Sequence, residues 1–126
     1  MMAAELSATL RAFIDQHMLT LDHVALLVAL REQPASAHAP TALAERSRLD
    51  RVVVDRVIAD LLAAQLVRWE GSEIQYTPPS DQRQIVDELA TAYRTMPVTL
   101  VRAIYARPNR AARSFAEAFR VRKENE

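Results

Sequence analysis

The sequence predicts a mainly α-helical protein with one small two-stranded β-hairpin. Alanine and leucine dominate its 126 residues, and apolar residues recur at helical spacing through most of the chain. β-Branched residues gather in only a few short runs. The only glycine, Gly71, stands between two strand-like segments, where a tight turn needs a positive φ. Most of the chain is therefore expected to be helix, with a sheet no larger than one hairpin.

Two helices are expected at the start of the chain, over residues 3–18 and 21–32. Their apolar residues recur every three or four positions, which places these side chains on one face of each helix. Thr20 suits the N-cap of the second helix. The segment 33–39 (QPASAHA) has no periodicity and is expected to be a loop. A short helix over residues 40–46 follows, and it begins with a proline, which suits a first helical turn.

A longer helix is expected over residues 50–65, with Asp50 as its N-cap. Its apolar residues fall on one face, which is expected to be buried. They are Val54, Val57, Ile58, Leu61 and Leu62. The period then changes from helical to alternating over residues 66–70 and 73–77. These two runs flank Gly71, and they predict the hairpin.

The rest of the chain is expected to be helical. Ser80 suits the N-cap of a helix over residues 81–95, and a second helix is expected over residues 97–106. The first of these has one apolar side, formed by Ile85, Leu89 and Tyr93. Arg107-Pro108-Asn109 interrupts the chain before a last helix that ends near Lys123.

The length suits a single domain, because 126 residues can form one core without disulfides or a metal. The expected organisation is an N-terminal helix over residues 1–20, a central unit over residues 21–77 and C-terminal helices over residues 80–126.

The central unit has the plan of a winged helix-turn-helix: two helices joined by a short turn, followed by a tight hairpin. Residues 43–67 resemble, without a gap, the pattern of winged-helix transcription regulators such as the MarR family. In that pattern Leu43 and Ala44 open the positioning helix, Leu49 closes the turn, and an apolar pair leads into the wing. The resemblance implies a DNA-binding regulator, with helices that flank the winged unit and form a dimer.

The resemblance also implies which residues face DNA. They lie in the turn, on the recognition helix and in the wing, and they are Arg48, Arg51, Val52, Val53, Arg56, Arg68 and Ser72. Arg51, Arg56 and Arg68 are expected to contact phosphates. Two glycines of the family pattern are replaced here by Arg48 and Gln65, so both residues are expected to adopt a left-handed conformation.

The predicted recognition helix departs from a DNA-binding pattern in two respects. Small polar residues usually occupy the positions held here by Val52 and Val53. Residues 50–65 also carry two basic and three acidic groups, which opposes phosphate binding. The alternative interpretation is therefore a winged-helix module that binds a protein partner and does not bind DNA.

The neutral net charge hides an uneven distribution. Residues 1–93 hold eight basic and thirteen acidic groups, whereas residues 94–126 hold eight basic and three acidic groups. Arg110, Arg113 and Arg120 recur at helical spacing in this basic tail. They either form a ridge that contacts phosphates or pair with acidic residues of the same chain or of a partner subunit, and we favour the pairing.

A homodimer through the terminal helices is expected, because these helices carry more apolar surface than one small winged unit needs. The residues that would otherwise be exposed are Leu6, Leu10, Phe13, Leu100, Ile104, Phe115 and Phe119. In the hairpin, Trp69 and Tyr76 are expected to pack on the core helix and not to stack on nucleic acid.

Composition argues against several other functions. Without cysteine there is no thiol catalysis, disulfide or cysteine-ligated metal, and a single glycine does not make a phosphate-binding loop. His17, His23 and His38 do not share an element, so neither a metal site nor a cofactor is expected. No catalytic motif is recognisable, and an enzyme is not expected. With no apolar run near ~20 residues and no secretion signal, we expect a cytoplasmic protein without a membrane anchor.

Overall fold

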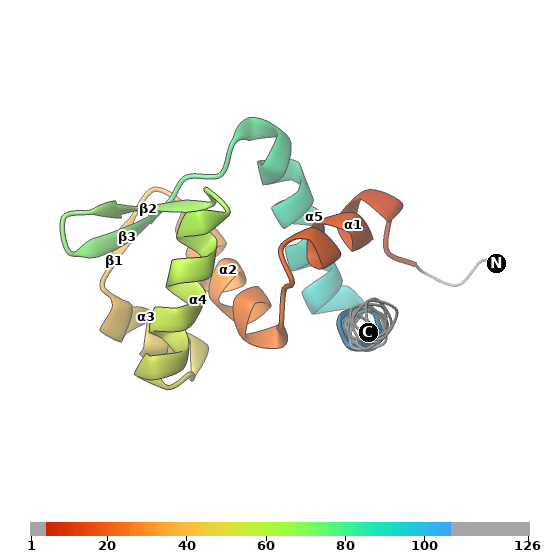
Figure 1. Cartoon of the computed structure of the whole chain (residues 1–126), viewed down its shortest axis with the longest axis horizontal. Helices are drawn as coiled ribbons and strands as arrows, with labels where there is room; N and C mark the ends of the chain where they lie inside the picture. Colours follow the sequence, from red (N-terminus) through yellow and green to blue (C-terminus); the bar gives the residue numbers. More distant parts are fainter. Residues whose placement is uncertain (1–4, 107–126) are drawn as a thin grey trace, which may run out of the picture.

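The computed structural model describes residues 5–106, which form a winged helix-turn-helix flanked by further helices (Figure 1). The winged unit consists, in chain order, of α2 (Leu21–Glu32), β1 (Ala37–His38), α3 (Pro40–Ser47), α4 (Arg51–Ala63), β2 (Val67–Glu70) and β3 (Glu73–Tyr76). The flanking helices are α1 (Ala8–Gln16), α5 (Ser80–Thr95) and a short helix over Pro97–Ala106. In Figure 1 the flanking helices lie at one end of the molecule, and α3 and the sheet lie at the other.

Side-chain caps define where the first two helices begin. Ser7 Oγ accepts a hydrogen bond from the backbone N–H of Leu10 at 3.0 Å, so α1 begins at Ala8 and not at residue 3 as expected. Thr20 caps α2 as predicted, and its hydroxyl accepts from the backbone N–H of His23. The His23 side chain in turn accepts from the backbone N–H of Thr20 at 3.1 Å, which completes a capping box.

The sheet has three strands, and the prediction of a two-stranded hairpin was incomplete. Residues 37 and 38, expected to lie in a loop, form β1, which pairs antiparallel with β3. The strand order is β1-β3-β2, so β3 is the central strand. Gln75 strengthens the new edge because its Nε2 donates a hydrogen bond to the carbonyl oxygen of Pro34 at 2.8 Å. His38 is therefore a buried strand residue and not a loop residue.

The predicted face of α4 is confirmed. Val54, Val57, Ile58 and Leu61 are buried, and Leu62 is partly buried against them. Asp50 occupies the N-cap position with extended backbone, but its side chain makes no capping hydrogen bond. The helix is thus stabilised in place by burial of its apolar face and not by its cap.

The start of α5 and one residue of its predicted buried face, Tyr93, differ from the prediction. Pro79 and not Ser80 is the N-cap residue, and its carbonyl accepts the backbone N–H of Arg83 at 2.9 Å. The buried residues are Val86, Leu89, Ala90 and Ala92, whereas Tyr93 is 40% exposed. Two residues of the predicted side are on the buried face, because Leu89 is fully buried and Ile85 packs against the core, where α5 meets α1 and α2.

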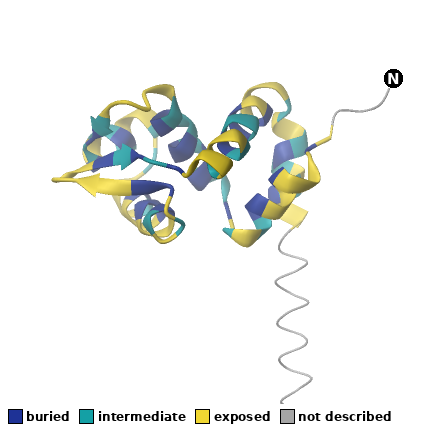
Figure 2. Ribbon diagram, turned by 90° about the horizontal axis from the view of Figure 1, so that it is seen from above, coloured by how far each residue is buried: buried dark blue, intermediate teal, exposed yellow. Residues whose placement is uncertain are grey.

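The core is shared by the winged unit and the flanking helices. Buried residues line the inner sides of the helices, and the wing is exposed beyond its base (Figure 2). Leu6, Leu10, Phe13, Leu100 and Ile104 all belong to this one core and are at most 5% exposed. The argument for a dimer from their exposure is therefore wrong, because α1, α5 and the Pro97–Ala106 helix bury them within one chain. Phe115 and Phe119 lie outside the described residues.

Candidate nucleic-acid interface

The turn between α3 and α4 is built on a left-handed residue. Arg48 has a φ of 57°, as expected, and the backbone N–H of Leu49 reaches back to the carbonyl oxygen of Ala44 at 3.0 Å. Leu43 is fully buried and Ala44 packs beside it, so α3 and α4 approach closely. This turn leaves the side chain of Arg48 exposed just before the recognition helix α4 begins.

The outward side of α4 lies opposite its buried face. Val52, Arg56, Ala59 and Ala63 recur there at helical spacing, and all four are exposed. Val52 is 78% exposed. Val53, which was expected to face DNA beside it, is partly buried and packs against the core. The outward side therefore presents small apolar groups around one arginine, and we call these four residues the outward face.

The charges beside the outward face are partly compensated within the chain. Arg51 Nε lies 2.8 Å from Asp55 Oδ1 one turn further along α4, and on the wing an Arg68 guanidinium nitrogen lies 3.4 Å from Glu70 Oε2. Such exposed pairs contribute little to stability, but each weakens the positive potential that a phosphate would meet. Arg48 and Arg56 have no ion pair within residues 5–106.

Asp60 is held on the flank of α4 that faces α2. Its Oδ2 lies 2.8 Å from Nε2 of His23, which is only 6% exposed. Nδ1 of the same ring accepts the backbone N–H of Thr20, so Nε2 carries the ring proton and donates it to Asp60. Sequence reasoning treated Asp60 only as a charge that opposes DNA. A contact between residues 37 positions apart has no local signal that could have revealed it.

The wing places its polar residues as the hairpin predicts, but not its tryptophan. Gly71 has a φ of 65° at the tip, and Ser72 beside it is exposed. Tyr76 is buried, as expected, whereas Trp69 is 49% exposed and does not join the core. Trp69 pairs in register with Ile74, which is fully buried on the central strand β3, whereas Trp69 itself stands on the edge strand β2.

Arg110, Arg113 and Arg120 lie outside the described residues. The helix that precedes them, Pro97–Ala106, lies at the end of the molecule opposite α3 and the wing (Figure 1).

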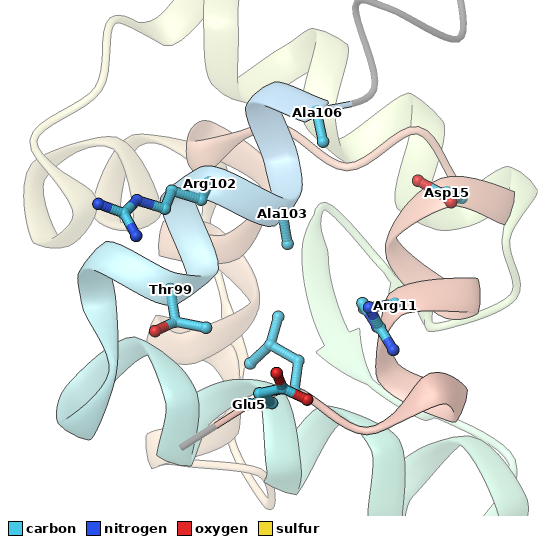
Figure 3. A pocket seen from close by; sticks show the side chains of 8 residues that line it. Glu5, Arg11, Asp15, Thr99, Arg102, Ala103 and Ala106 are labelled. Carbon is cyan, nitrogen blue, oxygen red and sulfur yellow. The ribbon is translucent and has the colours of Figure 1, made fainter. Parts of the chain in front are cut away.

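A cavity of about 380 Å³ lies at that same end, between α1 and the Pro97–Ala106 helix (Figure 3). Its lining is mostly apolar, with Leu6 and Ala103 on the wall, and charged residues from both helices stand around it. In Figure 3 Arg102 points away from α1, whereas Ala103 points toward it. The cavity is separate from the outward face of α4, so it takes no part in the interface.

Two further features concern metal and membrane. Within residues 5–106, no three histidine, aspartate or glutamate side chains come close enough together to hold a metal ion. In the same residues no single helix is long and apolar enough to span a membrane; α1 and α2 reach that length only as a pair bent by 111°.

No protein-family model matches this chain, and no curated protein matches it significantly. The resemblance to winged-helix regulators therefore depends on the residue pattern and on the fold.

Proposed function

We propose that the protein is a cytoplasmic winged-helix transcription regulator of the MarR type, which binds DNA as a homodimer without a cofactor. The observation that carries this proposal is Arg56. It lies in the middle of the outward face of α4, exposed and without an ion pair among the described residues, next to a helix-turn-helix with the expected geometry. A cation in this position suits a phosphate oxygen at the edge of a major groove.

The remaining predicted contacts contribute less directly. Arg48 in the turn and Ser72 at the wing tip are exposed and open to phosphates. Arg51 and Arg68 would have to exchange their carboxylate partners for phosphates, so their net contribution is expected to be small. We expect weak DNA binding outside a specific site, with a shallow salt dependence.

The proposal is tested by titrating mixed-sequence duplex DNA with the protein at low and then at raised salt. Fluorescence anisotropy measures the binding. Arg56→Ala should weaken binding and reduce the log-log salt slope by about 0.9, the value for one phosphate contact. Arg11→Ala is the matched control, because Arg11 is an exposed arginine on α1, away from the outward face. Equal loss in both variants, or no binding by the unchanged protein at low salt, would contradict the proposal.

Further variants locate the electrostatic contribution more finely. If the recognition helix and wing carry it, Arg51→Ala and Arg68→Ala weaken binding slightly and Arg56→Ala does so clearly. If the basic tail carries it, these changes have little effect, and the combined change of Arg110, Arg113 and Arg120 to alanine removes binding.

The homodimer is proposed through the terminal helices. Val98 and Tyr105 are 63% and 62% exposed on the Pro97–Ala106 helix. They are seven residues, or two turns, apart, so they lie on the same face of this helix. Light scattering at micromolar concentration should report twice the monomer mass, and Val98→Asp with Tyr105→Asp should reduce it to the monomer. A monomeric unchanged protein would remove the dimer and, with it, paired half-sites on DNA.

A second candidate function, binding of a protein partner, is favoured by the exposed apolar side chains. Val52 on α4 and Trp69 on the wing are exposed, while Arg51 and Arg68 are paired within the chain. Protein interfaces are rich in aromatic residues and poor in free charge. Failure of the DNA titration at low salt would favour this function, with these two side chains as its first contacts.

A further inference from the structure

Val52 is the most exposed large apolar side chain among the described residues, at 78%. It is the second residue of α4, on the outward face, one turn before Arg56. The two valines that follow it turn inward: Val53 packs against the core and Val54 is fully buried. Val52 alone of this run keeps its two methyl groups free in solvent.

Folding does not explain a valine at this position. A β-branched residue has a lower helix propensity than alanine, and an exposed one gains no burial in return. The neighbouring Arg51 and Asp55 form an ion pair with each other, and this pair does not need the side chain of Val52. The apolar surface of Val52 is therefore available to a bound partner.

In the DNA complex of the proposed function, the groups facing Val52 would be base edges of the major groove. Those edges carry hydrogen-bond donors and acceptors, and a valine side chain can pair with none of them. The one apolar group they carry is the C5 methyl of thymine. We propose that Val52 contacts a thymine methyl and that it is the residue that makes the protein prefer thymine at one position of each half-site. This inference depends on the proposed function.

The neighbouring charges fit this role. Arg56, one turn further along the same face, is free to hold a phosphate and thereby fix the depth of α4 in the groove. Arg51 is kept by Asp55 at 2.8 Å, so it does not compete for the acceptors of guanine beside Val52. At this position α4 would therefore distinguish bases by a methyl group and not by hydrogen bonds.

A pair of duplexes that differ only in this methyl group tests the inference. One is alternating deoxyadenosine and thymidine, and the other has the same length with deoxyuridine in place of every thymidine. Both carry the same phosphates and the same hydrogen-bonding edges. The unchanged protein should bind the thymidine duplex about fourfold more tightly for each contacted methyl, with the same salt slope for both.

Val52→Ala should bring this ratio close to one, and its melting temperature should match that of the unchanged protein because the side chain is exposed. Tyr93→Ala, which removes another exposed apolar side chain on α5, away from the outward face, should leave the ratio intact. Equal binding of both duplexes, or a ratio that survives Val52→Ala, overturns the role of Val52 and leaves DNA binding standing. Absence of binding to either duplex at low salt overturns the proposed function as well.

Discussion

Nε2 of His23, at the start of α2, lies 2.8 Å from Oδ2 of Asp60, near the end of the recognition helix α4. The other nitrogen of the ring accepts the backbone N–H of Thr20, so one imidazole joins the cap of α2 to the flank of α4. His23 is thereby a structural residue that orients the recognition helix relative to the helix behind it.

Replacement of His23 by alanine should lower the free energy of unfolding by about 1 to 3 kcal/mol, because it removes half of a capping box and the bond to Asp60. Asp60→Asn is the matched control, because its amide oxygen still accepts from Nε2 and its stability should change by less than about 1 kcal/mol. Urea denaturation measures both values. A His23→Ala variant as stable as the unchanged protein would show that the contact does not form.

Leu61→Asp should unfold the protein or make it insoluble. Leu61 is 1% exposed in the centre of the buried face of α4, and an unpaired buried carboxylate costs several kcal/mol against a total stability of roughly 5 to 15 kcal/mol. Ala59→Asp, two residues earlier on the outward face, should keep the helical circular dichroism spectrum. If both variants melt like the unchanged protein, the register of α4 is wrong.

Tyr76 should make the protein lose stability at alkaline pH. Burial, followed by the nearby charge of Asp87, raises the pKa of Tyr76 from 10.0 to about 12, although Arg83 and Arg31 oppose the shift. Between these two values the unfolded chain releases the phenol proton and the folded chain retains it, so the free energy of unfolding falls as pH rises. The expected fall is up to roughly 3 kcal/mol between pH 10 and 12.

Tyr76→Phe isolates this effect. The hydroxyl of Tyr76 is buried and has no hydrogen-bond partner within residues 5–106, so its removal should leave stability at pH 7 unchanged or slightly higher. The variant should then lose less stability than the unchanged protein above pH 10. Parallel curves for the two proteins in thermal melts from pH 8 to 12 would contradict the raised pKa.

Asp55→Asn should strengthen DNA binding at low salt by roughly two- to fivefold, because it removes a negative charge from the interface and releases Arg51. Asp81→Asn, at the start of α5, removes the same charge away from α4 and should have little effect. Fluorescence anisotropy with one duplex compares the three proteins. An Asp55→Asn variant that binds more weakly would mean that the carboxylate itself contacts the ligand.

The sequence was informative where a local signal determines the structure. Helical periodicity predicted the buried face of α4, and the single glycine predicted the turn of the wing, where Gly71 has a positive φ. The pattern also predicted left-handed backbone at Arg48 and Gln65, and both are confirmed, with φ values of 57° and 62°. Each of these features depends on residues within one or two turns of each other.

The features that were missed depend on contacts distant in sequence. The two residues of β1 have no periodicity, and they form a strand only because β3 pairs with them. Similarly, nothing near Leu6 or Ile104 shows that these two residues, far apart in the sequence, are buried in one core. For the interface, spacing identified Val52 and Arg56 as exposed, but it could not show that Arg51 and Arg68 are paired with carboxylates.

The place of β3 in the sheet determines how the wing can move. Because β3 lies between β2 and β1, and β1 leads directly into α3, the wing is not an arm on a free hinge. A swing of the wing toward or away from α4 would have to break the β1–β3 pairing and the bond from Gln75 to Pro34. The separation between the recognition helix α4 and the wing is therefore fixed. Under the proposed function, a DNA duplex that touches both would have to match this separation, so the DNA and not the protein would have to bend.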